Sequence, residues 1–316
     1  MEPGNSTGVM EFVLLGLSQT LEIQRFLFIL FLIFYSMILP VNILIILTIQ
    51  GEHHLGSLMF FFLANLAFLD TCYCSISTPK MLADFFSSSK TISYGGCMAQ
   101  IFFIHFLGAS ERYLLAVMSY DQYLAICKPL HYATLMNGRF CRQPAAGSWI
   151  NGCLAIAIIT CLMLQLNFCG PNEIDHFFCE STQIINLCCT DTYLIELVIT
   201  ILVVLFTLPP FALTVVSYVC IISTILTIPS TTGRQKTFST CSSHLIVVTI
   251  FYGTLMIVYL LPKTNTLRDL NKVFSVFYTI LTPITNPFIY SLRNKKVKEA
   301  LRKIICKCAD FTRIPN

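Results

Sequence analysis

Residues 26–49 read FLFILFLIFYSMILPVNILIILTI, and this stretch carries no charged side chain. An α-helix needs about 20 mostly apolar residues to cross the hydrocarbon core of a bilayer, so a membrane-spanning helix is predicted here. Further segments of this kind follow at Leu58–Leu82, Met98–Tyr120, Ala145–Leu166, Leu194–Ile228, Thr237–Leu261 and Val273–Leu292. The sequence therefore predicts an all-α membrane protein, a seven-transmembrane helix bundle.

The composition of the whole chain supports the same class. Of 316 residues, 55% are hydrophobic and only 11% are charged. A soluble domain carries about 25% charged residues, and a disordered chain needs low hydrophobicity, so both classes are excluded. The net charge of +4 is too small to indicate a nucleic-acid partner. The chain contains no G-x-S-x-G, H-E-x-x-H or P-loop pattern, and we therefore do not expect an enzyme.

The basic residues of the predicted loops orient the chain in the membrane. Thirteen Lys and Arg residues fall on the side of the C-terminus and six on the side of the N-terminus. Cytoplasmic loops carry the excess of positive charge, so we expect a multi-pass plasma-membrane protein with an extracellular N-terminus and a cytoplasmic C-terminus. The predicted regions are an extracellular segment 1–25 with the glycosylation sequon at Asn5, a membrane domain 26–293 and a cytoplasmic tail 294–316.

Apolar residues recur at helical spacing in the cytoplasmic tail. Val297, Leu301, Ile304 and Cys308 are separated by three or four residues, and basic residues stand between them. This pattern predicts a short amphipathic helix that lies on the inner leaflet, where Cys306 and Cys308 could be acylated.

Five sequence motifs occur in order along the chain and carry a family resemblance. They are Asn5-Ser6-Thr7, the stretch 61–70 (FFLANLAFLD), 118–132 (MSYDQYLAICKPLHY), 236–245 (KTFSTCSSHL) and 283–294 (PITNPFIYSLRN). Together they resemble the olfactory receptors, the largest branch of the rhodopsin-like G-protein-coupled receptors, over nearly the whole chain. The resemblance implies a receptor for small-molecule odorants that acts through a stimulatory olfactory G protein to raise cAMP, without a cofactor other than a possible sodium ion.

Cysteines of the outer side face an oxidising compartment and can pair. These are Cys97, Cys169, Cys179, Cys188 and Cys189. The resemblance implies the disulfides Cys97–Cys179 and Cys169–Cys189, which leave Cys188 over.

Polar residues within the predicted spans are the first candidates for function, because an intramembrane carboxylate costs a few kcal/mol. Asp70, Glu111 and Asn286 are such residues, and the family alignment adds Asn42. The resemblance places Asp70 and Glu111 opposite each other, where they could share a sodium ion or a proton. A hydrogen-bonded network that only holds the helices together is an equal alternative.

Arg112 is a basic residue near the middle of the predicted third span. Members of the family usually carry no base here. The side chain either contacts Asp70 or a neighbouring helix, or is a purely destabilising substitution.

The cytoplasmic end of the same span departs from the family pattern. The triplet Asp121-Gln122-Tyr123 stands where the family has Asp-Arg-Tyr, whose Arg meets the G protein. Gln lacks the fixed charge and the forked donors of Arg. A looser inactive state and a poorer G-protein contact have opposite effects, and we expect the second to dominate. The alternative to a signalling receptor is thus a chain that binds but signals weakly or not at all. The family also uses Tyr218 and Tyr290 in this switch.

The resemblance also implies a ligand pocket in the outer half of the bundle. Its lining is mostly apolar and suits a small volatile molecule with one polar group, although each aromatic side chain could equally serve helix packing. A transporter or channel is a more remote alternative, because the intramembrane charges are few. The implied pocket residues are Ile104, His105, Gly108, Ala109, Leu202, Val203, Phe206, Tyr252, Leu255, Met256, Tyr259, Val276 and Thr279.

Overall fold

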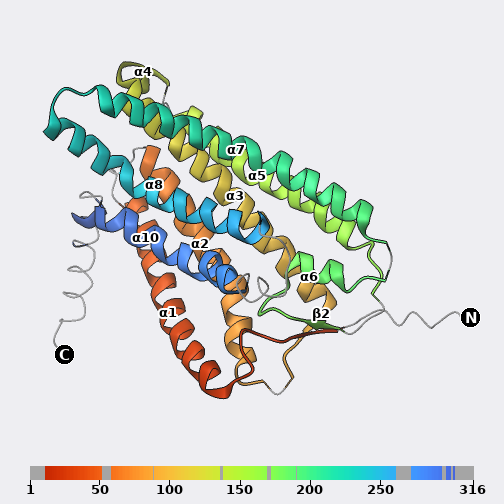
Figure 1. Cartoon of the computed structure of the whole chain (residues 1–316). Coiled ribbons are helices and arrows are strands. Elements are labelled where there is room, and N and C mark those ends of the chain that lie inside the picture. Colours follow the sequence, from red (N-terminus) through yellow and green to blue (C-terminus); the bar gives the residue numbers. More distant parts are fainter. Residues whose placement is uncertain are drawn as a thin grey trace, which may run out of the picture.

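A computed structural model gives the fold, in which long helices form an elongated bundle (Figure 1). A small sheet lies at one end of the bundle and the short helix α4 at the other. The structure describes residues 11–51, 58–87, 89–135, 138–168, 172–189, 191–260, 272–293, 297–299 and 302. The glycosylation sequon and most of the tail, including Cys306 and Cys308, lie outside these residues.

The long helices coincide with the apolar segments of the sequence. They are α1 (Leu21–Gly51), α2 (Leu58–Asp84), α3 (Tyr94–Cys127), α5 (Gly138–Met163), α7 (Tyr193–Thr227) and α8 (Thr231–Leu260). The last helical stretch consists of residues 272–276, a π-helical turn η2 (Phe277–Leu281) and α10 (Thr282–Arg293). Two short helices, α4 (Pro129–Leu135) and α6 (Ser181–Asn186), were not predicted.

Five of these helices, α1, α2, α3, α5 and α7, are long and apolar enough to cross a membrane within the described residues. The helix α8 adds a sixth span if its two parts, Thr231–Ser239 and Cys241–Met256, are counted together across a bend of 46°. An all-α bundle with membrane-length helices is therefore confirmed. The seventh span stays a prediction, placed on the stretch 272–293.

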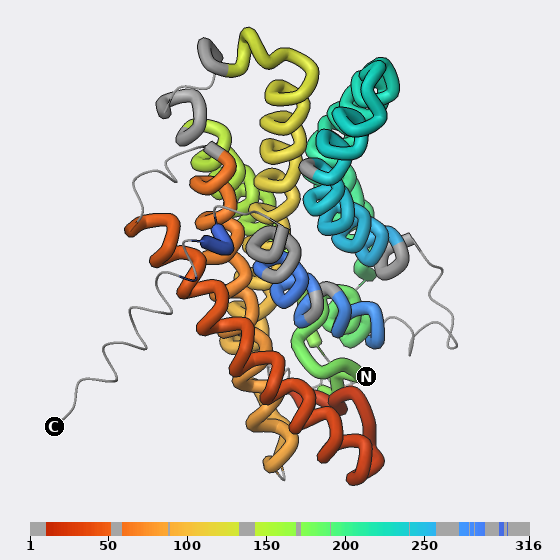
Figure 2. Tube along the Cα trace, turned by 90° about the vertical axis from the view of Figure 1, so that its left-hand side faces the viewer, coloured from red at the N-terminus to blue at the C-terminus, as the bar shows by residue number. Residues whose placement is uncertain are grey.

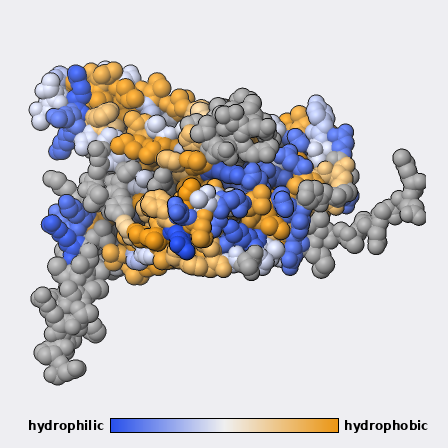
Figure 3. Space-filling view, turned by 60° about the horizontal axis from the view of Figure 1, so that its bottom comes forward, coloured by the Kyte–Doolittle hydropathy of each residue, from blue (hydrophilic) through white to orange (hydrophobic). Residues whose placement is uncertain are grey.

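The outer surface of the bundle carries many large apolar side chains. Phe26 on α1 is 65% exposed, and Leu205 and Val216 on α7 are about as exposed. Figure 3 shows apolar side chains over much of the surface along the bundle, and Figure 2 places α1 and α7 on opposite sides of it. Contiguous apolar surface on this scale is unfavourable in water and favourable against lipid.

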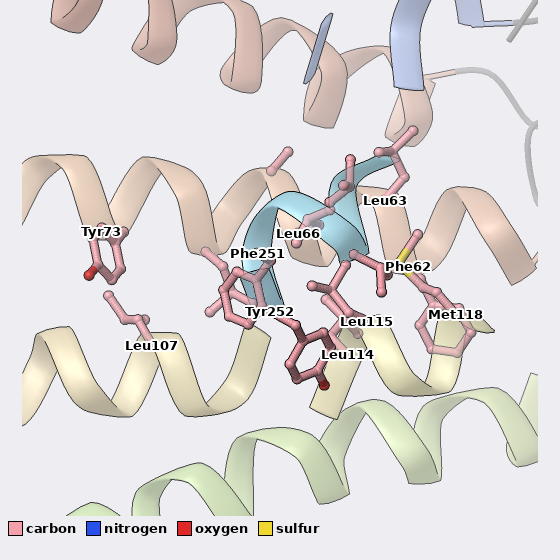
Figure 4. Packing of buried hydrophobic residues seen from close by; sticks show 14 of the residues in the cluster. Phe62, Leu63, Leu66, Tyr73, Leu107, Leu114, Leu115, Met118, Phe251 and Tyr252 are labelled. Atoms are coloured by element: carbon pink, nitrogen blue, oxygen red, sulfur yellow. The ribbon is translucent and has the colours of Figure 1, made fainter. Parts of the chain in front are cut away.

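The buried core is built around α3. One cluster joins α2, α3 and α8 through Leu66, Leu114 and Phe251, which point toward one another in Figure 4. Close packing of α3 against α5 depends on Gly152, because a Cβ at this position would lie 2.6 Å from Ser110 Oγ.

A three-stranded sheet closes the end of the bundle at which α3 begins, and it was not predicted. The strand β1 (Glu11–Leu14) lies between β2 (Thr91–Ser93), with which it is antiparallel, and β3 (Glu173–Ile174), with which it is parallel. Phe12 is fully buried, so residues 11–14 pack against the loops that carry β2 and β3.

Candidate functional site

The loop between α5 and α7, which the sequence predicts to face outward and which is called the outer loop below, is tied to the start of α3. A disulfide joins Cys97 to Cys179, as the resemblance implied, and the N–H of Cys179 donates to Gln100 Oε1 at 2.9 Å. Cys189 is also disulfide-bonded. The partner implied for it, Cys169, lies outside the described residues. The loop is thereby fixed above the outer half of the bundle.

A cavity of about 40 Å³ lies below this loop, between α2, α3 and α8. Four pocket residues implied by the resemblance line it, together with two aromatic residues that sequence reasoning missed. Phe251 could have been found because it precedes Leu255 by one helical turn, and Tyr73 follows Asp70 by nearly one turn. The lining consists of Tyr73, Ile104, His105, Gly108, Glu111, Arg112, Phe251 and Leu255.

The loop and the cavity meet at His105. Its Nδ1–H donates to the carbonyl oxygen of Ile101 at 2.8 Å, because a carbonyl can only accept. Nε2 is then the acceptor nitrogen, and it lies 3.5 Å from the hydroxyl of Ser181 on α6. A wall residue of the cavity thus touches the outer loop directly.

Several of the other expected pocket residues belong to the surrounding core. The O–H of Tyr252 donates to the backbone oxygen of Arg112 at 3.5 Å, and Thr279 donates to the backbone oxygen of Ser275 at 2.6 Å. Val276 packs against the same core cluster as Tyr252.

The remaining pocket residues implied by the resemblance do not line the cavity. Ala109, Leu202 and Val203 pack in a second cluster. Phe206 is half-buried and Met256 is 41% exposed, and neither lines the cavity. The side chain of Tyr259 lies outside the described residues.

A buried polar cluster joins three helices beside the cavity. The side-chain amide of Asn286 on α10 donates to Asp70 Oδ1 and Oδ2 at 3.1 and 3.2 Å, and to Glu111 Oε1 at 3.3 Å. All three side chains are buried. Asn42, which is also buried, donates to the carbonyl of Ile38 on its own helix, so its described contact lies outside this cluster.

The cluster offers oxygen ligands for a hard cation. Asp70 and Glu111 contribute carboxylates, and the buried Oδ1 of Asn286 has no hydrogen-bond partner. Among the described residues, however, no group of three or more His, Cys, Asp or Glu side chains could hold a metal ion. The residues fit a weakly held monovalent ion or a proton better than a divalent metal.

Arg112 makes a contact to a neighbouring helix rather than to Asp70. Its Nη1 donates to Thr207 Oγ1 on α7 at 3.3 Å. Its Nε is buried without a hydrogen-bond partner.

The C-terminal end of α3 carries the altered triplet. Asp121 accepts a hydrogen bond from Tyr132 of α4 at 3.0 Å, and the O–H of Tyr218 on α7 donates to Gln122 Oε1 at 3.3 Å. The Tyr218 oxygen also lies 2.5 Å from Nδ1 of His244 on α8. The triplet is thus linked to both α7 and α8 without an arginine.

Tyr123 and Tyr290 are the two remaining residues of the expected switch. Tyr123 is partly buried against the main core cluster. The side chain of Tyr290 lies outside the described residues.

The outer loop is also linked to the beginning of the last helical stretch. Lys272 Nζ lies 2.5 Å from Asp175 Oδ1. The neighbouring His176 is buried between the rings of Phe177 and Phe178. Burial, reinforced by the positive charge of Lys272 and opposed by Asp175, lowers the pKa of His176 to about 3.

Membrane-length apolar helices around an internal cavity, with a polar cluster at the helix crossing, define a multi-pass membrane protein of the helical-bundle class. The family model described as olfactory receptor matches residues 31–308. The chain belongs to the olfactory receptor family.

Relatives support this assignment along the whole chain. Olfactory receptor 4M1 of Mus musculus is 50% identical over 307 residues, which cover 96% of this chain and 97% of that protein. Olfactory receptor 4M1 of Homo sapiens is 49% identical over 97% of this chain and 98% of its own length. Olfactory receptor 10A7 of Homo sapiens is 46% identical, covering 95% of each chain. Members of this family are G-protein-coupled receptors for odorants, not enzymes.

Proposed function

We propose that this chain binds small volatile molecules inside the bundle and activates a stimulatory olfactory G protein, which raises cAMP. The observation that carries the proposal is the cavity between α2, α3 and α8. Ligand sites are often built between the helices of a bundle, and four of the eight residues that line this cavity carry polar or charged side chains. Its outer boundary is a loop that the Cys97–Cys179 disulfide holds in place.

The proposed orientation has residues 1–25 outside the cell and residues 294–316 in the cytoplasm. Two observations support it. The C-terminal side carries the excess of Lys and Arg, and the disulfide lies at the opposite end of the bundle from α4. Because disulfides persist in oxidising compartments, the disulfide end faces outward, with Asn5 available for a glycan. Residues 26–293 form the receptor domain in this proposal.

The polar cluster of Asp70, Glu111 and Asn286 is proposed to couple the ligand cavity to the rest of the bundle. It shares Glu111 with the cavity wall, and it connects α2, α3 and α10. A sodium ion or a proton shared by the two carboxylates would add to the same network. Removal of sodium from a purified sample, followed by thermal unfolding, tests whether the ion contributes.

A second candidate is a receptor that binds but signals weakly or not at all. Gln122 favours this candidate. It lacks the charged guanidinium group of the arginine that the family carries at the surface that meets the G protein. The hydrogen bond from Tyr218 keeps the link between α3 and α7 but supplies no charge.

A cAMP reporter assay separates these candidates. Cells express the olfactory G protein together with this chain or its Gln122→Arg variant, and surface staining normalises the signal. A response of the variant alone indicates a sound pocket with a disabled switch, whereas a response of both indicates a working receptor.

A further inference from the structure

Arg112 sets the chemistry of the cavity. It is the cationic member of the eight lining residues, beside the carboxyl group of Glu111. The single side-chain hydrogen bond that the described residues give it goes to the neutral hydroxyl of Thr207. None of the carboxylates described lies within ion-pair distance of its guanidinium.

The guanidinium of Arg112 therefore has unused hydrogen-bonding capacity. It remains charged in a protein and carries five N–H donors in a fixed planar arrangement. Its Nε–H is buried and has no partner. A charge within the membrane-spanning part of the bundle that forms no ion pair is unfavourable, and a ligand that supplies a paired carboxylate would reduce this cost.

Glu111, the adjacent carboxyl group, interacts electrostatically with Arg112 but forms no ion pair with it. Glu111 accepts a hydrogen bond from Asn286 and belongs to the buried cluster with Asp70. His105 presents an acceptor nitrogen away from its own helix, since its Nδ1–H is used by the Ile101 carbonyl. An acceptor such as a carboxylate finds its strong donor at Arg112 and not at His105.

We propose that the preferred ligand of this cavity is a small organic acid whose carboxylate pairs with Arg112. Planar carboxylates match the guanidinium fork with two parallel hydrogen bonds. The cavity of about 40 Å³ has room for the carboxylate headgroup, and Ile104, Phe251 and Leu255 are the apolar lining residues that a short hydrocarbon part would contact. This inference rests on the proposed function, because it names the ligand class of the same cavity.

The proposal assigns Arg112 the role of a specificity-determining residue. A hydrocarbon tail of given length contributes equally in an acid, an alcohol and an aldehyde, so only the headgroup differs among them. The order of affinity within such a set therefore reports the contact with Arg112 directly.

The experiment measures ligand-dependent thermal stabilisation of the purified full-length chain in lipid nanodiscs, which does not require signalling. The panel contains straight-chain carboxylic acids with the alcohols and aldehydes of the same lengths. The chain is compared with Arg112→Gln, Arg112→Lys and the control Arg25→Gln, which removes an exposed arginine at the start of α1. Arg112→Gln removes a poorly compensated charge, so the variant should fold at least as well.

The expected result is that acids stabilise the protein more than their matched alcohols. Arg112→Gln should weaken the acids by at least about tenfold and leave the alcohols unchanged. Arg112→Lys should lose part of the preference, and Arg25→Gln none. If alcohols or aldehydes bind best, or if Arg112→Gln leaves the acids unchanged, the inference is wrong and the proposed function stands. If no compound stabilises the protein, the proposed function fails as well.

Discussion

Tyr218 on α7 donates a hydrogen bond to the side-chain oxygen of Gln122 on α3 across 3.3 Å, while its oxygen lies 2.5 Å from His244 on α8. Three helices thus meet at the Tyr218 side chain, near the end of α3 that carries the altered triplet. In the family the position of Gln122 carries an arginine. The neutral link preserves the contact between helices and omits the charge that the G protein would meet.

Replacement of Gln122 by Arg should raise the ligand-dependent cAMP signal several-fold when equal amounts of receptor are at the cell surface. The reason is that the substitution restores the charged guanidinium group and its paired hydrogen-bond donors. The cAMP reporter described above measures this. Tyr218→Phe serves as the companion variant, because it removes only the hydroxyl that joins the three helices, and it should lower the response in either background. Equal signals from the chain and the Gln122→Arg variant would show that the arginine is dispensable here.

Loss of the outer disulfide should destabilise the protein. Cys179→Ser frees the loop from α3, and removal of a native disulfide typically costs about 2–5 kcal/mol. Thermal unfolding of purified protein and surface staining of cells both report the change. Cys153→Ser is the matched control, because Cys153 is an exposed, unbridged cysteine on α5. A Cys179→Ser variant as stable as this control would contradict the structural role of the loop.

The amide of Asn286 is predicted to hold the two buried carboxylates together. Asn286→Asp places a third carboxyl group against Asp70 and Glu111, and we expect a loss of roughly 3 kcal/mol or more in thermal unfolding. The double variant Asp70→Asn with Asn286→Asp returns the cluster to two carboxyl groups and one amide, so it should recover much of this loss. A double variant no more stable than Asn286→Asp would argue against direct coupling.

The outer loop should loosen on acidification because of His176. Its pKa is near 6.5 when exposed and about 3 when buried, so the unfolded loop takes up a proton that the packed loop does not. The loop is therefore fully stabilised above about pH 6.5 and loses stability as the pH falls toward 3. Between pH 6.5 and pH 5 the loss should be roughly 1.5 kcal/mol.

Hydrogen exchange of loop residues 172–189, corrected for intrinsic rates, measures this change. His176→Gln cannot titrate and should flatten the pH dependence, even though Lys272 and Asp175 still face the site. An unchanged slope in the variant would assign the effect to another group.

The long helices and their apolar surfaces could be predicted from the sequence, because a long apolar segment with few charges forms few structures other than a membrane-spanning helix. The sheet formed by residues 11–14, 91–93 and 173–174 could not, since strands of two to four residues are fixed by tertiary pairing rather than by periodicity. The contact of Arg112 with Thr207 also depends on the rotation of α7 against α3, which sequence spacing does not encode.

The candidate site was predicted in part. Ile104, His105, Gly108 and Leu255 line the cavity, and the resemblance placed them there through position alone. Met256 is instead largely exposed on the neighbouring helical face. An alignment gives positions along each helix, whereas helix rotation and the bend in α8 decide which positions face inward.

A ligand in this cavity is proposed to drive the receptor signal, and substitution of Gly108 tests this step. A Cβ at Gly108 would meet no atom within 4 Å, so Gly108→Leu fills the cavity without a backbone clash. Gly147 on α5 is equally open but lies away from the cavity, which makes Gly147→Leu the matched control. In the Gln122→Arg background, with an odorant panel and surface staining, the account predicts that Gly108→Leu abolishes the cAMP response and Gly147→Leu preserves it. A full response from Gly108→Leu at equal surface level would show that the ligand does not act from this cavity.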